Sequence, residues 1–243
     1  MTLIGCAGWS LPASLREEFR AEGSHLERYA QRLNACEINS SFYRPHGFDT
    51  YRRWGESVPA GFRFSVKVPQ AITHDSRLAG CDSALADFIA QARGLGDKLS
   101  CLLVQLPPSL ALQPPAAEDF FEALRSHWEG GVACEPRHAS WFTARADALL
   151  RLHRVARVLA DPVRHDAGAM PGGHRGLVYL RLHGSPRVYY SSYPPDVIAA
   201  LAARIQMAER GGAEVWCMFD NTASGAAAGD ALALQRALQQ DLR

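Results

Sequence analysis

Eight short apolar segments recur along the chain, and helical patterns separate most of them. The segments lie at about residues 3–8, 35–41, 62–68, 100–106, 131–136, 157–161, 177–183 and 214–220. Successive side chains of a strand point to opposite faces. In segment 177–183 this places Tyr179, Arg181 and His183 on one face. The other face is apolar and suited to packing under helices: Val178, Leu180 and Leu182.

Helical patterns are predicted over residues 25–33, 82–94, 144–153, 196–210 and 229–242, and around Phe120, Phe121 and Leu124. Ser24 with Glu27 three residues later forms a capping box for the first helix. Strict alternation of strands and helices favours a parallel sheet with right-handed crossovers. The chain has 243 residues, which suits one barrel domain over residues 1–243. We therefore predict a TIM-like (β/α)8 barrel of eight parallel strands.

One connection breaks the alternation. Residues 161–175 contain Pro162 and the run Pro171-Gly172-Gly173, so no regular helix is expected between strands six and seven. A doubly wound open sheet is the competing architecture. That fold usually carries a glycine-rich first turn, and residues 5–9 do not match its fingerprint.

Composition narrows the class of protein. Hydrophobic residues make up 47% of the chain and charged residues 21%, as in an ordinary soluble globular protein. The net charge of +1 argues against broad electrostatic binding to nucleic acid or an anionic membrane. The first residues show no signal peptide and no apolar run is long enough to span a membrane. The six cysteines form no C-x-x-C pair, so we expect reduced thiols and a cytoplasmic protein.

Polar side chains gather where the strands end, and barrels of this type carry their active sites at the C-terminal ends of the strands. The mouth candidates for substrate binding are Trp9, Asn39, Ser41, Tyr43, Lys67, His74, Gln105, Arg137, His138, Arg181 and Asn221. The catalytic candidates are Glu135, Asp161 and His183. For the deeper Glu37, Arg63 and Tyr179 we expect structural pairing, because an unpaired buried charge is costly.

Two short motifs suggest roles for these residues. In Glu135-Pro136-Arg137-His138 a carboxylate lies beside an arginine and should stay ionised. That state suits a nucleophile, an electrostatic stabiliser or a metal ligand better than a general acid. In Arg181-Leu182-His183-Gly184 an imidazole shares a face with a cation, and histidine is well suited to proton transfer near neutral pH.

Metal and serine chemistry have weaker support. Glu37, Glu135, Asp161 and His183 offer oxygen ligands and one imidazole, yet no H-E-x-x-H or comparable spacing accompanies them. No G-x-S-x-G turn is present for a nucleophilic serine. We therefore assign no metal and no cofactor, while a divalent metal stays an alternative.

The motifs also resemble those of a known family. They are Gly5-Cys6-Ala7-Gly8-Trp9, Glu37-Ile38-Asn39-Ser40-Ser41-Phe42-Tyr43, Lys67 with Ile72-Thr73-His74, Gln105-Leu106-Pro107-Pro108, Glu135-Pro136-Arg137-His138 with Ser140-Trp141, Arg181-Leu182-His183-Gly184, and Phe219-Asp220-Asn221. In this order the chain resembles the YecE-like family, domain of unknown function 72. The resemblance implies a (β/α)8 barrel and no established activity. The first loop, residues 10–23, is shorter than is usual in that family and has Phe19 as its one aromatic residue.

These observations lead to two hypotheses. The first is an enzyme, hydrolase- or isomerase-like, that acts on a small anionic (phosphate- or carboxylate-bearing) or sugar-like substrate. Lys67, Arg137 and Arg181 would hold the anion, while His183 and Glu135 would transfer protons. Glycoside hydrolysis by Glu135 with Asp161 and metal-dependent phosphodiester cleavage are two versions of it. The second is a non-catalytic protein that binds a metabolite or single-stranded nucleic acid, with the near-neutral charge against the nucleic acid.

Overall fold

A computed structural model describes residues 2–240, and its strands form one mostly parallel sheet. In spatial order the sheet runs β7-β9-β10-β1-β2-β3-β4-β5-β6-β8. The strands are β1 (Leu3–Ala7), β2 (Ala35–Ile38), β3 (Arg63–Lys67), β4 (Leu99–Gln105), β5 (Gly131–Glu135), β6 (Ala156–Arg157), β7 (Leu159–Asp161), β8 (Gly172–Gly173), β9 (Leu177–Leu182) and β10 (Glu214–Phe219). Every segment predicted as a strand is present.

The sheet bends into a nearly closed barrel, because β6 and β7 are two parts of the sixth predicted strand. Ala156 of β6 pairs with Ala133 of β5, and Ala160 of β7 pairs with Arg181 of β9, both in parallel register. The two ends of the sheet therefore meet on either side of Val158. The TIM-like prediction is confirmed. The division of strand six, and the short β8 that pairs antiparallel with β6, were not expected.

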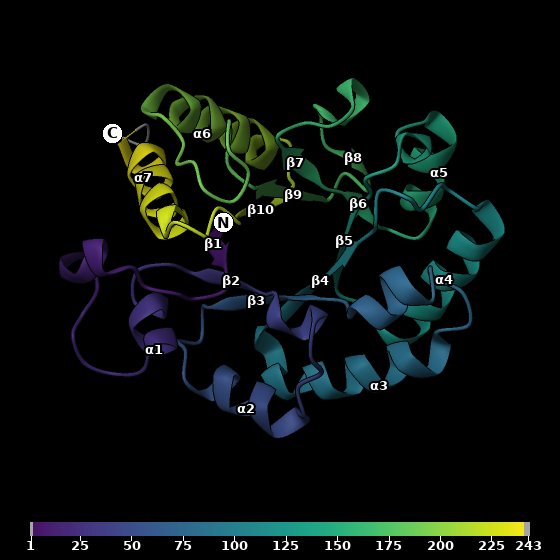
Figure 1. Ribbon diagram of the computed structural model, residues 1–243, viewed down its shortest axis with the longest axis horizontal. Coiled ribbons are helices and arrows are strands. Elements are labelled where there is room, and N and C mark those ends of the chain that lie inside the picture. The colour runs from purple at the N-terminus through teal and green to yellow at the C-terminus, as the bar shows by residue number, and fades with distance from the viewer. Residues whose placement is uncertain (1, 241–243) are drawn as a thin grey trace.

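Helices surround the outside of the strands (Figure 1). They are α1 (His25–Ala30), α2 (Phe48–Glu56), α3 (Asp82–Ala92), α4 (Pro114–His127), α5 (Ala144–Leu152), α6 (Pro195–Arg210) and α7 (Ala226–Gln240). The capping box of Ser24 and Glu27 is formed as predicted. Helix α2 is an addition to the sequence prediction. The expected end of the last helix, residues 241 and 242, lies outside the described residues.

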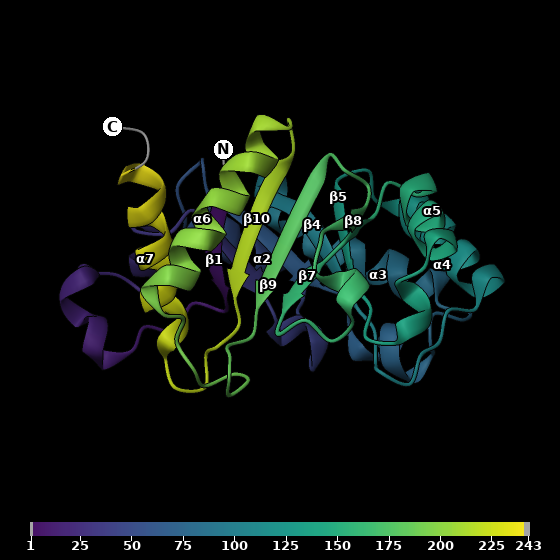
Figure 2. The same cartoon turned by 90° about the horizontal axis from the view of Figure 1, so that it is seen from above.

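The connection from β7 to β9 carries a short 3₁₀ turn, Asp166–Gly168, and β8 in place of a regular helix. This confirms the expected gap in the outer helix layer. Figure 2 shows β9 and β10 running in the same direction beneath α6, with the loops that form the barrel mouth beyond their arrowheads.

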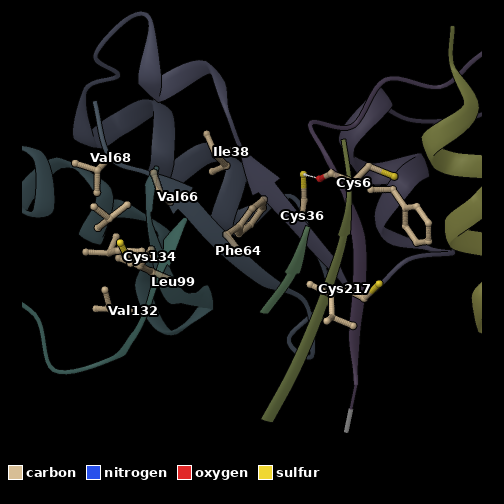
Figure 3. Close-up of a cluster of buried hydrophobic side chains, with 14 of the residues drawn as sticks. Cys6, Cys36, Ile38, Phe64, Val66, Val68, Leu99, Val132, Cys134 and Cys217 are labelled. Atoms are coloured by element: carbon tan, nitrogen blue, oxygen red, sulfur yellow. Dashed lines mark hydrogen bonds between the residues drawn. The ribbon is translucent and has the colours of Figure 1, made fainter. Parts of the chain in front are cut away.

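Two apolar clusters stabilise the barrel, one on each face of the sheet. The outer cluster packs under the helices, and Figure 3 shows part of it, including Ile38, Phe64, Val66, Cys134 and Cys217. Val178, Leu180 and Leu182 belong to this cluster, as strand alternation predicts. The inner cluster fills the barrel below the mouth and includes Ala35, Cys101, Leu103, Tyr179 and Trp216.

A close contact joins the first two strands. A side chain at Gly5 would overlap the carbonyl oxygen of Ala35 on β2, so only glycine fits. Beside it the buried Tyr29 hydroxyl accepts a hydrogen bond from the Cys6 N–H at 2.7 Å and donates to the Ala35 carbonyl at 2.9 Å. Helix α1 is thereby bonded to both strands.

All six cysteines are buried and none forms a disulfide. Within residues 2–240, no helix combines the length and the apolar character needed to cross a membrane.

Candidate active site at the barrel mouth

Arg181 lies at the centre of the polar cluster that closes the barrel interior. Its side chain extends from β9 and makes three ion pairs. Nη2 lies 2.7 Å from Glu37 Oε1 and 3.0 Å from Asp220 Oδ2, and Nη1 lies 3.0 Å from Glu135 Oε2. All four side chains are buried, with Arg181 only 1% exposed. The three carboxylates thus share one guanidinium that water scarcely reaches.

The deeper polar residues support this cluster. The Tyr179 hydroxyl donates to Glu37 Oε2 at 2.9 Å and lies 2.7 Å from the Ser65 hydroxyl. Glu37 and Tyr179 therefore have the structural pairing that the sequence predicted. Arg63 does not join them, because its guanidinium donates to the carbonyls of Ala60 and Phe62 at the other end of β3.

The anion-holding role expected for Arg181 does not fit this geometry. Its Nε also donates to Glu37, and Nη1 donates to Gln105 Oε1 at 3.2 Å. Glu37, Glu135 and Asp220 all pair with its guanidinium, so Arg181 has little remaining capacity to bind an external anion.

His183 is held between two carboxylates at the same level. Its Nδ1 lies 3.0 Å from Asp220 Oδ2 and its Nε2 lies 3.3 Å from Glu135 Oε1. Burial alone would lower the pKa of this imidazole. The hydrogen bonds to Asp220 and Glu135 outweigh burial and raise the pKa above its ordinary value of 6.5. His183 thus holds a proton more readily than a free histidine.

The two carboxylates beside His183 stay ionised. Burial raises the pKa of each, but Arg181 and His183 outweigh it, so both pKa values are lowered and that of Glu135 lies well below 4.5. This agrees with the prediction that Glu135 is no general acid. Asp220 was absent from our catalytic and binding candidates. Asp220 alternates with Trp216 and Met218, two residues of β10 that point to the inner face. This spacing could have identified Asp220 as a residue of the barrel interior.

A small cavity of about 40 Å³, partly open to solvent, adjoins His183 and Glu135. Arg137 and Arg164 line it together with Tyr189. Arg137 donates from Nε and Nη2 to Glu135 Oε1 at 3.0 and 2.8 Å. Among the described residues, Arg137 Nη1 and the whole guanidinium of Arg164 have no hydrogen-bond partner. The cavity therefore joins an imidazole to cationic groups that are available to a ligand.

Tyr189 covers this cavity in an unusual backbone conformation. Its φ is +70°, in the left-handed region that non-glycine residues seldom adopt. Its ring packs edge-on against the His183 ring, with centroids 5.7 Å apart, and its N–H donates to the His183 carbonyl. Strained residues of this kind cluster at ligand sites.

Lys67 and its neighbours form the opposite side of the mouth. The Lys67 Nζ lies 4.0 Å from the centroid of the Phe42 ring, and the His74 ring packs against the same ring at 4.9 Å. Ser41 donates to the Lys67 carbonyl at 2.6 Å, so this hydroxyl fixes the backbone of β3. Burial lowers the pKa of Lys67 to about 8, with Arg181 adding to the effect. Burial and Lys67 in turn lower the pKa of His74.

Asp161 is the clearest departure from the predicted site. We expected it to point into the barrel beside Glu135. Its partner in β9 is Leu182, an outward residue, and its Oδ2 accepts a hydrogen bond from the Tyr193 hydroxyl at 2.7 Å. It lines a separate cavity under α6 with Leu201 and Arg204. A glycosidase pair of Glu135 with Asp161 is therefore not assembled.

The other candidates divide between the mouth and its surroundings. Gln105 joins the Arg181 cluster. Asn221 donates to the Ser191 carbonyl and to Asp230, so it holds the loop after β9. His138 caps the short turn at Ser140. The remaining three candidates lie in the loops that follow the first two strands. Trp9 packs on Trp54, and Tyr43 is largely exposed. Asn39 Oδ1 is buried and has no hydrogen-bond partner among the described residues.

The suggested metal ligands are not arranged as a metal site. Glu37, Glu135 and His183 surround the Arg181 guanidinium, whose positive charge occupies the position a cation would need, and Asp161 faces away. Within residues 2–240 no group of three histidine, cysteine, aspartate or glutamate side chains is placed to hold a metal ion.

Sequence comparison finds relatives in two bacteria. The UPF0759 protein YecE of Escherichia coli (strain K12) is 30% identical over 168 residues, which cover 66% of this chain and 59% of that protein. The UPF0759 protein YunF of Bacillus subtilis (strain 168) is 28% identical over 153 residues, which cover 59% of this chain and 53% of that protein. The chain thus matches less than two thirds of the length of these curated relatives.

Structural comparison finds solved proteins with a similar fold. A DUF72 family protein from Enterococcus faecalis V583 matches with a TM-score of 0.80 and 20% identity, over 98% of this chain and 96% of that chain. One from Thermotoga maritima MSB8 matches with a TM-score of 0.76 and 21% identity, over 98% and 100%. A methyltransferase from Methanosarcina mazei, with a TM-score of 0.51 and 10% identity over 100% and 95%, shares the fold alone.

The family model described as "Protein of unknown function DUF72" matches residues 3–243, nearly the whole sequence. The chain therefore belongs to the DUF72, or YecE-like, family.

Proposed function

We propose that this chain is an enzyme that transfers protons to and from a small anionic substrate bound at the barrel mouth. His183 is the acid–base group, and Glu135 and Asp220 hold its ring. Arg137 and Arg164 bind the anionic group of the substrate. The observation that carries the proposal is the buried imidazole, bonded to a carboxylate at each nitrogen, beside a cavity with two arginines.

Charge balance supports the role of His183. The cluster contains three carboxylates, Glu37, Glu135 and Asp220, and two guanidiniums, Arg137 and Arg181. One further proton makes it neutral, and the raised pKa of His183 favours the imidazole as its site. The carboxylate at Nδ1 also orients the ring, which is the usual function of such a partner. Because Asp220 holds Nδ1, the proton on Nε2, at the longer hydrogen bond of 3.3 Å, is the one transferred to a substrate group in the cavity.

The arginines support an anionic substrate. Arg137 is fixed by Glu135 through two nitrogens, which leaves Nη1 as an ordered donor. Arg164 lines the same cavity and is exposed. Guanidinium groups bind carboxylate and phosphate oxygens through parallel hydrogen bonds, and these are strongest where water is partly excluded.

Calorimetric titration with inorganic phosphate and a panel turnover assay test the proposal together. Arg164→Gln is expected to weaken phosphate binding by about 10-fold or more, since a hydrogen bond to a charged group contributes about 1.5–3 kcal/mol. The matched control is Arg204→Gln, in the cavity under α6. The panel contains phosphate esters, sugar phosphates and carboxylates.

The outcomes separate the alternatives. Turnover that His183→Gln abolishes while phosphate binding persists is the result expected. Binding of phosphate without turnover across the panel favours the non-catalytic metabolite-binding alternative. Equal phosphate affinity in the wild type and Arg164→Gln would contradict the anion subsite. Binding of an oligonucleotide that weakens steeply with salt would instead favour nucleic acid.

A further inference from the structure

We propose that Lys67 is an imine-forming amine, so that the substrates of this mouth are small carbonyl compounds that carry an anionic group. The inference rests on the proposed function, because it assigns a substrate class and a covalent role to the same mouth. It gives the mouth two chemical centres, an amine on β3 and an imidazole on β9.

The chain has two lysines, and their surroundings differ. Lys98 donates through Nζ to the backbone carbonyls of Gly55 and Val58, so it holds the turn after α2. Lys67 is 4% exposed, and within residues 2–240 its Nζ has neither a hydrogen-bond partner nor a carboxylate within 4.0 Å. Nearly every buried amine is paired. A buried amine without such a partner therefore points to chemistry.

The cluster around Arg181 explains how an unpaired amine is tolerated. Arg181, Arg137 and protonated His183 together balance the charges of Glu37, Glu135 and Asp220, so these carboxylates are neutralised without Lys67. Burial and the charge of Arg181 lower the Lys67 pKa to about 8, against the opposing effect of the three carboxylates. At pH 8 about half of such an amine is neutral, whereas an ordinary lysine with a pKa of about 10.4 is neutral in under about 1% of molecules.

The surroundings of Lys67 also fix its position. The Ser41 hydroxyl bonds to its carbonyl, and the Val68 N–H that follows bonds to the Leu103 carbonyl of β4. The Phe42 ring lies 4.0 Å from Nζ. His74, whose ring packs edge-on against the same Phe42 ring, belongs to a π-helical turn, Ala71–Asp75, and such turns often occur at functional sites. A positioned, largely desolvated amine is the form in which lysine acts as a nucleophile.

The reaction is a condensation. The lone pair of the neutral Lys67 Nζ attacks the carbonyl carbon and forms a C–N bond. The π bond of the carbonyl breaks at the same time, which leaves a C–O single bond. The carbonyl oxygen then leaves as water, taking the two protons that the amine loses, and a C=N bond remains. No oxidant or reductant takes part. Hydrolysis reverses the sequence and restores the free amine.

Reductive trapping tests the proposal on the wild-type protein. Pyruvate is added at about pH 8 with sodium cyanoborohydride, which transfers hydride to the imine carbon and leaves a stable secondary amine. Peptide mass spectrometry then compares the adduct at Lys67 with that at Lys98, an internal control in the same chain. Lys67 is expected to react at least about 10-fold faster, because a large fraction of its amine is neutral at this pH, whereas the Lys98 amine is bonded to two backbone carbonyls. Acetone, a methyl ketone without the carboxylate, is expected to label Lys67 more slowly than pyruvate.

Each outcome bears on one proposal. Equal or slower labelling of Lys67 relative to Lys98 overturns the imine role, whatever the phosphate titration gives. Labelling by acetone as fast as by pyruvate keeps the amine but contradicts the anionic substrate. Lys67→Met is expected to lose the adduct at residue 67 while Lys98 is labelled at the wild-type rate. If that variant fails to fold, the comparison of the two lysines in the wild type still decides the matter.

Discussion

Nη2 of Arg181 lies 2.7 Å from Oε1 of Glu37, although β10 and β1 separate their two strands in the sheet. The pair therefore spans the interior of the barrel. Below it, Tyr179 and Trp216 fill the interior with stacked rings. The top of the interior is thus stabilised by buried charge and the lower part by apolar packing, and the first prediction concerns that charge.

Replacing Arg181 should make the protein unfold more readily, because it removes the one cation that three buried carboxylates share. For Arg181→Leu we expect a loss of about 3–5 kcal/mol in the free energy of unfolding, the range for breaking a buried ion pair. Urea unfolding followed by circular dichroism measures it. Arg204→Leu, an exposed arginine that donates to a backbone carbonyl, is the control and should lose less than about 1 kcal/mol. Similar midpoints for the two variants would show that the charge cluster is dispensable for folding.

The His183 imidazole should titrate above its ordinary value, while two other histidines titrate below it. Burial and Arg44 lower the pKa of His46, and burial and Lys67 lower that of His74. Carbon–nitrogen correlated NMR spectra across about pH 5–9 give all three pKa values in one sample. A His183 pKa below that of His74 would refute the hydrogen-bonded arrangement with Asp220 and Glu135.

The same group predicts a pH dependence of stability. Because the folded-state pKa of His183 is raised, its protonated form adds stability that is complete below the unfolded value of about 6.5 and is lost as the pH rises through the folded pKa. The stability difference between the wild type and His183→Gln should therefore shrink between about pH 6 and pH 9. A difference that grows over this range contradicts the shift.

Removing one hydroxyl should weaken the contact of α1 with the sheet. In Tyr29→Phe the buried Cys6 N–H loses its partner, and an unsatisfied buried donor costs about 1–3 kcal/mol. Thermal and urea unfolding measure the loss. Tyr43→Phe makes the same chemical change on a largely exposed ring and should leave the stability within about 0.5 kcal/mol. An unchanged Tyr29→Phe midpoint would mean that another group satisfies Cys6.

Adding a methyl group at Gly5 should destabilise the protein, since β1 and β2 would have to separate. We expect Gly5→Ala to lose about 1–3 kcal/mol or more, as overpacking does. The control is Gly61→Ala, where a methyl group meets no atom within 4 Å, and its stability should hardly change. Equal stabilities would indicate that the strands have room to shift.

Strand alternation predicted the inner face well where one face is clearly polar. In β9 the assignment of Tyr179, Arg181 and His183 to the interior follows from the apolar residues between them. In the stretch 157–161 one face carries Arg157, Leu159 and Asp161 and the other Val158 and Ala160, so here the polar face is the outer one and polarity misleads. Asp161 consequently faces the helices although it ends a strand.

Other features depend on contacts that no local pattern encodes. Helix α2 shows no clear apolar stripe, because its two buried positions are Tyr51 and Gly55. Gly55 is buried because the backbone of Leu95 packs closely against it. The ion pair of Arg181 with Glu37 joins residues 144 positions apart. The residue types were visible in the sequence, but which carboxylate neutralises which arginine depends on the closed barrel.

The division of strand six at Val158 has a consequence for motion. Residues 156 and 157 bond to β5, whereas residues 159–161 bond to β9, so this stretch lacks a continuous ladder on either side. Its amide protons should exchange with solvent deuterium sooner than those of β10, which pairs along its length with β9 and over residues 216–219 with β1. Val158 and Ala160 also line the cavity beside His183. Local opening of the barrel wall at residues 156–161 would widen the cavity and admit a ligand from the side, while the other strands stay paired.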